Sequence, residues 1–83
     1  MKWVAVSDII VTEAFLQTQP KQSKLNRIRE YYSEYGSVDK PITLNKNNVL
    51  IDGYMRYVVL KENDAEYAKC EIINWIPKKR KVV

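Results

Sequence analysis

The segment Asp52–Arg56, which reads Asp-Gly-Tyr-Met-Arg, holds the residue types best suited to chemistry in this chain. A glycine turn that leads into a helix presents backbone N–H groups, and such a turn is suited to holding an anion. Asp52 is expected to cap the helix by accepting from N–H groups two or three residues onward. Arg56, one turn into the helix, has a planar guanidinium that can fork onto a phosphate or a carboxylate. The open alternative is ordinary turn chemistry without a ligand, since Asp-Gly is common at such turns.

A strand before this segment and a helix after it are needed to position it. Val49-Leu50-Ile51 is a short apolar run rich in β-branched residues, which predicts a buried strand. After the turn, apolar residues recur at i, i+3 and i+4, at Met55, Val58 and Val59. This spacing predicts a helix from about Gly53 to Glu62, and Asn63 is expected to end it in the left-handed conformation.

The other elements complete a small mixed sheet. A hairpin at residues 41–51 has an asparagine-rich turn, and asparagine tolerates positive φ. Further strands are expected at residues 2–6 and 65–73. The fold class is therefore α+β, with a small mixed β-sheet and two main helices. The length of 83 residues allows one domain, which we place at residues 1–76, followed by a tail at 77–83.

The second main helix, at residues 23–35, has the clearest pattern. Its apolar stripe steps by three or four residues and consists of Leu25, Ile28, Tyr32 and Tyr35. Ser23 is its expected N-cap, unless Pro20 occupies the first turn, and Gly36 is its expected stop. Because they lie on the stripe, Tyr32 and Tyr35 are expected in the core.

Other apolar residues are assigned to the core by their neighbours in sequence. Trp3-Val4-Ala5-Val6 is nearly continuous, which is typical of a strand buried on both faces. Phe15 and Leu16 are expected to fill the core, and Cys70 to be a small buried hydrophobe. Trp75 and Ile76 either close the core or form an exposed patch.

Missing residue types exclude several kinds of chemistry. The chain has no histidine, so it lacks the commonest metal ligand and the usual general base at neutral pH. Its one cysteine excludes an internal disulfide and a cysteine zinc cluster. No signal peptide or membrane-spanning segment is visible, which favours a cytoplasmic protein. These absences make an enzyme the less favoured class.

Most of the excess positive charge lies in the tail. The net charge is +4, and four basic residues stand together at Lys78, Lys79, Arg80 and Lys81. Without them, basic and acidic residues balance at ten each. The economical interpretation is a tail that contacts nucleic acid phosphates. The alternatives are a solubilising end, or a nuclear import signal, which the tail resembles.

The order of elements around residues 52–56 resembles the N-terminal domain of ParB, in the ParB/sulfiredoxin fold. That family shows an apolar strand followed by Asp-Gly-x-His-Arg, and this chain has Ile51-Asp52-Gly53-Tyr54-Met55-Arg56. Methionine replaces the histidine. The stretch Lys40-Pro41-Ile42-Thr43-Leu44 resembles the family's preceding strand. The resemblance covers about residues 3–73 and suggests a minimal, stand-alone version of this domain, of the phage or mobile-element type.

The resemblance implies a nucleotide or nucleic acid ligand, with CTP or ATP and magnesium as the expected small molecules. Asp52 would shape the turn, Gly53 would let the backbone approach a phosphate, and Arg56 would pair with it. Tyr54 and Met55 would present first-turn N–H groups. The family's ligand pocket also has a Pro/Arg-rich loop, which here corresponds to residues 12–22 and lacks an arginine. Sulfiredoxin chemistry is excluded because no cysteine stands in the Gly-x-x-Arg turn.

A second function class remains open. The same fold can serve as an inert module that binds or inhibits another protein. Helix 23–35 and the region of Trp75 are then the candidate interfaces. The two classes differ in whether function depends on Arg56 or on residues such as Tyr31 and Trp75. In either case a location in the cytoplasm, near the nucleoid for a DNA binder, is expected.

Overall fold

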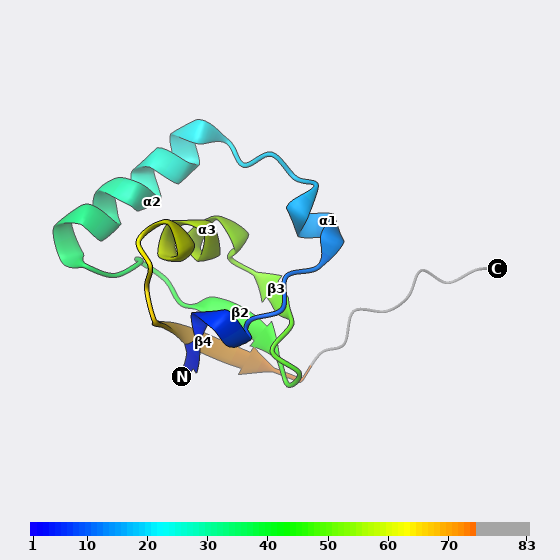
Figure 1. Cartoon of the computed structure of the whole chain (residues 1–83). Helices are drawn as coiled ribbons and strands as arrows, with labels where there is room; N and C mark the ends of the chain where they lie inside the picture. Colours follow the sequence, from blue (N-terminus) through cyan, green and yellow to red (C-terminus); the bar gives the residue numbers. More distant parts are fainter. Residues whose placement is uncertain (75–83) are drawn as a thin grey trace.

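The computed structural model describes residues 1–74, which form a four-stranded sheet with helices (Figure 1). The strands are β1 (Lys2–Ala5), β2 (Ile42–Asn45), β3 (Leu50–Asp52) and β4 (Tyr67–Ile73), in the order β1-β4-β2-β3. β4 pairs antiparallel with β1 and parallel with β2, and β2 pairs antiparallel with β3. The sheet is therefore mixed, as predicted.

Helices cover one face of this sheet in two layers. They are the 3-10 turn η1 (Val6–Asp8) and the helices α1 (Glu13–Leu16), α2 (Gln22–Tyr35) and α3 (Tyr54–Glu62). Figure 1 shows α3 lying on the sheet and α2 lying over α3. The two main helices are those predicted. The four-residue helix α1 was not predicted, because its sequence has no clear period.

Two apolar clusters hold these layers together. The larger one joins the sheet to α3, and Ile42 and Cys70 within it have no exposed surface. The smaller one joins α2 to α3 and contains Leu25, Ile28 and Val59. Burial raises the pKa of the Cys70 thiol to about 11, so the thiol is neutral at physiological pH. The prediction that Cys70 is a small buried hydrophobe is confirmed.

Three large side chains assigned to the core from sequence are exposed. Trp3 is 64% exposed because only one face of β1 is covered, and its neighbour Val4 takes the buried position. Leu16 is 62% exposed at the end of α1, although Phe15 beside it packs against the core. Tyr35 is 61% exposed in the last turn of α2, where its ring lies 4.4 Å from that of Tyr31. Tyr32 packs against both clusters, as predicted.

The helix ends agree with the sequence in part. Gly36 ends α2 with φ of 70°, as predicted, but the N-cap is Lys21 rather than Ser23. At the end of α3, Asn63 has φ of −101° and the left-handed residue is Asp64, with φ of 53°. Asn63 stays near helical geometry because its side-chain amide donates to the Val59 carbonyl at 2.8 Å.

The hairpin before α3 is fixed by its asparagines. Asn45 is buried, and its side-chain oxygen accepts from the N–H groups of Asn47 and Val49 at 2.8 and 3.0 Å. Asn48 has φ of 65°, which confirms the expected positive φ in this turn. Ile10 pairs its backbone with Asn48 and Leu50, so the segment before α1 is tied to the β3 edge. The chain therefore reaches Asp52 in a defined direction.

The predictions for Trp75, Ile76 and the basic residues of the tail lie outside the described residues, and the boundary at residue 76 stays a prediction. Within residues 1–74, none of the helices has the length and apolar character needed to span a membrane.

Candidate functional site

The turn between β3 and α3 is formed by Asp52 and Gly53. Gly53 has φ of 92° and ψ of 30°, a left-handed conformation that favours glycine, and it occupies the N-cap position of α3. Asp52 was expected to cap the helix, and this prediction is wrong. Its carboxylate accepts at 2.9 Å from the N–H of the adjacent Gly53 and bonds no N–H group of the helix. Asp52 therefore shapes the turn and leaves the helix end open.

Gly53 is also required by packing against β2. A Cβ added there would lie 2.9 Å from the Cγ2 atom of Ile42 and 3.2 Å from its Cα atom. Ile42 is fully buried, so it has little room to shift. The glycine thus sets the distance between the start of α3 and the centre of the sheet.

The open N-terminus of α3 leaves polar backbone groups available. The first helical bond of α3 runs from the Tyr57 N–H to the Gly53 carbonyl, at 3.0 Å. In residues 1–74 no protein group accepts from the N–H groups of Tyr54 and Met55. Free N–H groups at a helix N-terminus, together with the helix dipole, favour an anion. These two N–H groups are therefore open at the helix N-terminus, and their contact with a ligand stays a prediction.

Arg56 is held by Asp39, a partner that the sequence did not indicate. The Nε and Nη2 atoms of Arg56 donate to the two carboxylate oxygens of Asp39 at 2.8 and 3.2 Å. The hydrogen bond from Arg56 lowers the pKa of the Asp39 carboxyl, with desolvation opposing this and the guanidinium charge adding to it. The pair fixes Arg56 beside the helix N-terminus, while Nη1 makes no described bond.

These groups border a hollow of ≈ 480 Å³, which we call the α3 hollow. One wall is the predicted segment, Asp52 to Arg56. The other comes from α1, the loop after it and the start of α2, at Phe15, Thr18, Gln19, Pro20, Lys21 and Lys24. The structure therefore brings all five predicted site residues to one concavity.

The charge and aromatic character of the α3 hollow suit an anionic planar ligand. Lys21, Lys24 and Arg56 are its cations, and Asp52 is its acidic residue among those described. The ring of Phe15 stacks on that of Tyr54, with centroids 5.4 Å apart and an interplanar angle of 23°. Cations that can bind phosphate thus lie near an aromatic wall.

Sequence reasoning missed Lys21 and Asp39 as site residues. Lys21 stands in a segment without periodicity, and no sequence pattern placed it near the turn. Lys24 lies on the predicted helix 23–35, and no sequence pattern placed it near the turn. Asp39 lies 17 residues before Arg56, in a linker, and only the folded chain brings the two together.

The donor set of the α3 hollow limits how magnesium could bind. Residues 1–74 contain no group of three metal-ligating side chains. Asp52 offers one carboxylate, which fits Mg²⁺ only where a nucleotide's phosphates and water supply the other ligands. A metal at the α3 hollow would therefore need most of its ligands from a bound molecule or from water.

Solved structures share this fold. A pNOB8-like ParB N-domain matches with a TM-score of 0.77 and 20% identity, over 90% of this chain and 30% of that chain. A free serine kinase in complex with AMP matches with a TM-score of 0.69 and 21% identity, over 92% and 32%. A conserved hypothetical protein from Pyrococcus furiosus also has a TM-score of 0.69, with 22% identity over 88% and 32%.

The predicted fold is confirmed by these structures: the chain has the ParB N-domain-like α+β fold. It spans about a third of the length of each of these solved chains. The sequence matches no known protein family and no curated protein.

Proposed function

We propose that this protein binds a nucleotide by its phosphates at the α3 hollow. The observation that carries the proposal is the convergence of three cations on an uncapped helix N-terminus, within one concavity. Each feature alone is common at protein surfaces. Together they provide charge, directed N–H donors and enclosed volume at one point, which is what phosphate recognition requires. The AMP complex of the free serine kinase supports a nucleotide as the ligand for this fold.

The proposed ligand is CTP or ATP with magnesium. The N–H groups of Tyr54 and Met55 donate to one phosphate, and Lys21 and Lys24 neutralise the others. Gly53 keeps the turn free of a side chain, and Asp52 holds the turn through its bond to the Gly53 N–H. The stacked pair Phe15 and Tyr54 forms the apolar wall beside the phosphates.

Arg56 can bind a phosphate without leaving Asp39. A guanidinium has five N–H donors, and Asp39 uses only the edge formed by Nε and Nη2. The Nη1 edge remains for the ligand. Asp39 therefore orients Arg56 at the cost of offsetting part of its charge.

A titration of the labelled protein with CTP, ATP and AMP, with magnesium present, tests this proposal by amide NMR. Saturable shifts at Gly53, Tyr54 and Arg56 are expected with one nucleotide. Arg56→Gln should remove them. Arg29→Gln is the matched control, because Arg29 makes the same kind of pair with Glu62, at 2.7 Å, away from the hollow. No saturable shift at the turn with any of the three nucleotides would refute the proposal.

The basic tail is proposed to add a contact to DNA. Lys78, Lys79, Arg80 and Lys81 form a compact run of positive charge in the sequence. Binding of this kind is electrostatic, so its affinity for a duplex should fall steeply with salt. Replacing the four residues by glutamine should abolish that binding and leave the nucleotide shifts at Gly53 unchanged.

An inert protein-binding module is the second candidate, favoured by the exposed aromatic pair on α2. Tyr31 and Tyr35 are 37% and 61% exposed, and such rings are common anchors at interfaces. If this candidate is right, Tyr31→Ala will impair binding of the partner protein and Arg56→Gln will not. The reverse result supports nucleotide binding.

A further inference from the structure

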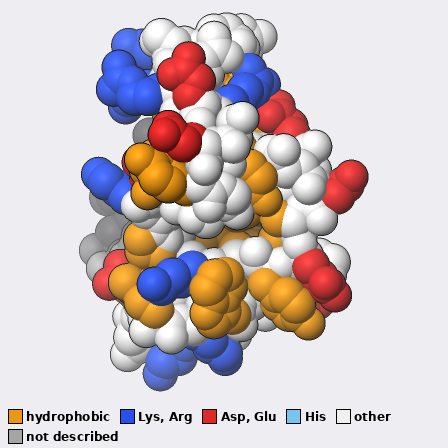
Figure 2. All heavy atoms as spheres, turned by 90° about the vertical axis from the view of Figure 1, so that its left-hand side faces the viewer, with side chains coloured by type: hydrophobic (Ala, Val, Ile, Leu, Met, Phe, Trp, Pro, Cys, Tyr) orange, Lys and Arg blue, Asp and Glu red, His pale blue; other side chains and the backbone are white. Residues whose placement is uncertain are grey.

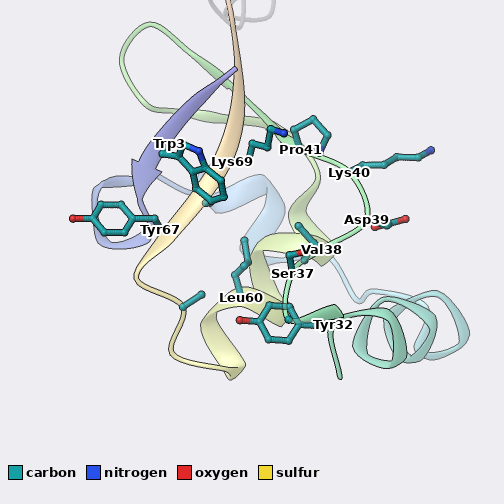
Figure 3. Close-up of a pocket in the computed structure, with 13 residues that line it drawn as sticks. Trp3, Tyr32, Ser37, Val38, Asp39, Lys40, Pro41, Leu60, Tyr67 and Lys69 are labelled. Carbon is teal, nitrogen blue, oxygen red and sulfur yellow. The ribbon is translucent and has the colours of Figure 1, made fainter. Parts of the chain in front are cut away.

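A second hollow lies at the opposite end of the helical layer, and we call it the Trp3 hollow (Figure 3). It has a volume of ≈ 400 Å³ and is lined by Trp3, Tyr32, Leu60, the loop 36–41 and the start of β4. It exists because β2 begins only at Ile42, which pairs with Cys70. The first residues of β4 therefore have the loop 36–41, and not a strand, on the side away from β1.

The mouth of the Trp3 hollow carries exposed aromatic side chains. Trp3 lies directly opposite Lys69 in the β1–β4 ladder, so both side chains stand on the sheet face that no helix covers. Tyr67 is on the same face, two residues earlier in β4. Trp3 and Tyr67 are 64% and 54% exposed. Figure 3 shows Trp3 and Lys69 side by side over β4, with Tyr32 and Leu60 coming from the helices.

The charge beside these rings is positive. Lys69 and Lys40 line the Trp3 hollow and form no described ion pair. Asp39 also lines it, but its carboxylate is bound on both oxygens by Arg56. Figure 2 shows this side of the molecule, where hydrophobic side chains gather in the lower half beside both basic and acidic ones. Large exposed rings combined with unpaired lysines favour an anionic ligand with a planar ring.

Backbone donors also face the Trp3 hollow. The Val6 N–H donates to the Glu66 carbonyl at 2.9 Å, which fixes the alternation of the β1–β4 ladder. By that alternation, the N–H groups of Tyr67 and Lys69 point away from β1, toward the loop 36–41. No carbonyl of that loop accepts from either group in the described residues. These N–H groups can bond the edge of a ring that enters the hollow.

We propose that the Trp3 hollow binds a base of single-stranded nucleic acid. Trp3 stacks on the base, the N–H groups of Tyr67 and Lys69 meet its edge, and the lysine side chains meet the flanking phosphates. Stacking on an exposed ring beside basic side chains is the general chemistry of single-strand binding. A duplex does not fit, because its bases are already stacked and paired. This site is separate from the α3 hollow and does not depend on nucleotide binding there.

Tryptophan fluorescence tests this proposal in the full chain. The variant Trp75→Phe leaves Trp3 as the only tryptophan, since the sequence has two. Titration at low salt with an oligothymidylate of about twelve nucleotides should quench Trp3 fluorescence saturably, because single-strand sites cover ~4–16 nucleotides. In the full chain, Trp3→Ala should weaken binding of the same oligonucleotide, measured by anisotropy, by about tenfold or more, the size expected for one lost base stack. Trp3 is exposed, so this change leaves the core intact.

Two controls separate this site from other binding. Replacing Lys78, Lys79, Arg80 and Lys81 by glutamine removes the tail charge, and the Trp3 quench should persist. Lys69→Gln should reduce the affinity and its salt dependence, while the same change at the exposed Lys46, distant in the hairpin turn, should not. Free TMP tells whether a mononucleotide suffices, and we expect its binding to be at least tenfold weaker than that of the oligonucleotide.

The proposal is overturned if Trp3 fluorescence does not change with the oligonucleotide. It is also overturned if Trp3→Ala and Lys69→Gln leave the affinity unchanged, or if the quench vanishes when the tail is neutralised. TMP binding as tight as the oligonucleotide would overturn a single-strand site in favour of a mononucleotide site.

Discussion

Asp39 lines the Trp3 hollow and pairs with Arg56 of the α3 hollow, but the two hollows are built by different means. At the α3 hollow, a left-handed glycine packed against the sheet sets the geometry, and a bidentate ion pair orients the cation. At the Trp3 hollow, exposed side chains on an uncovered sheet face provide most of the proposed ligand contacts. A substitution at Gly53 of the first hollow should therefore destabilise the fold, whereas the exposed side chains of the second hollow can be replaced without destabilising it.

The largest expected effect is on stability, from Gly53→Ala. A non-glycine residue in the left-handed region costs ~1–2 kcal/mol, and the new Cβ would also meet Ile42 at 2.9 Å. We expect a loss of about 2–4 kcal/mol in the free energy of unfolding, measured by urea denaturation. Gly36→Ala at the Trp3 hollow is the control, because its φ is 70° but no atom lies within 4 Å of the new Cβ. Equal losses for the two would show that the packing of Gly53 is not a constraint.

Variants of the two hollows should have opposite effects on the affinities for nucleotide and for oligonucleotide. Arg56→Gln removes a charge-assisted hydrogen bond, worth ~1.5–3 kcal/mol, so nucleotide affinity should fall about ten- to a hundredfold. Its effect on oligonucleotide binding at Trp3 should be smaller, because it only frees the Asp39 carboxylate that lines that hollow. Trp3→Ala should show the reverse pattern in the same two titrations. If either variant weakens both ligands equally, the two hollows are not independent.

Asp39→Asn should have a smaller effect, because it removes a partner and not a ligand group. Nucleotide affinity should rise a few-fold, since Arg56 regains the charge that Asp39 offsets. Stability should fall by no more than about 1 kcal/mol, as is usual for ion pairs near the surface. Glu62→Gln breaks the Arg29 pair at a similar cost and is the control for affinity, which it should leave unchanged. A drop in affinity for Asp39→Asn would mean that orienting Arg56 outweighs offsetting its charge.

The sequence predicted the helices and strands better than it predicted which of their side chains are buried. The strand, turn and helix around Asp52 and the stop at Gly36 follow from local rules of spacing and backbone conformation, and the structure has them. Trp3 was misplaced because an apolar run does not reveal that helices cover only one face of the sheet. Leu16 and Tyr35 were misplaced for a similar reason, since their exposure depends on where neighbouring helices end.

In the candidate site too, the sequence revealed the local motif but not the contacts that the fold creates. Residues 52–56 were found because they are contiguous and carry a motif. Asp39 was not found, because its relation to Arg56 is purely tertiary. The prediction that Asp52 caps α3 was wrong because Gly53, in its left-handed conformation, takes the N-cap position. The Asp52 carboxylate accepts from the Gly53 N–H instead. A motif can therefore locate such a site, but only the fold shows what holds it.

The smallest expected effect is the pH dependence of the Asp39 pair. The hydrogen bond from Arg56 lowers the pKa of Asp39 below its ordinary value of about 4. A lowered pKa means that the pair's contribution to stability is present above that ordinary value and is lost as the pH falls through the lowered pKa. Arg56→Gln should raise the Asp39 pKa, measured by carboxyl-carbon NMR, and leave Glu62 unchanged. Arg29→Gln should raise only the pKa of Glu62, which Arg29 lowers in the same way. An Asp39 titration that does not respond to Arg56→Gln would show that the pair does not form in solution, and Arg56 would then lose its fixed position beside α3.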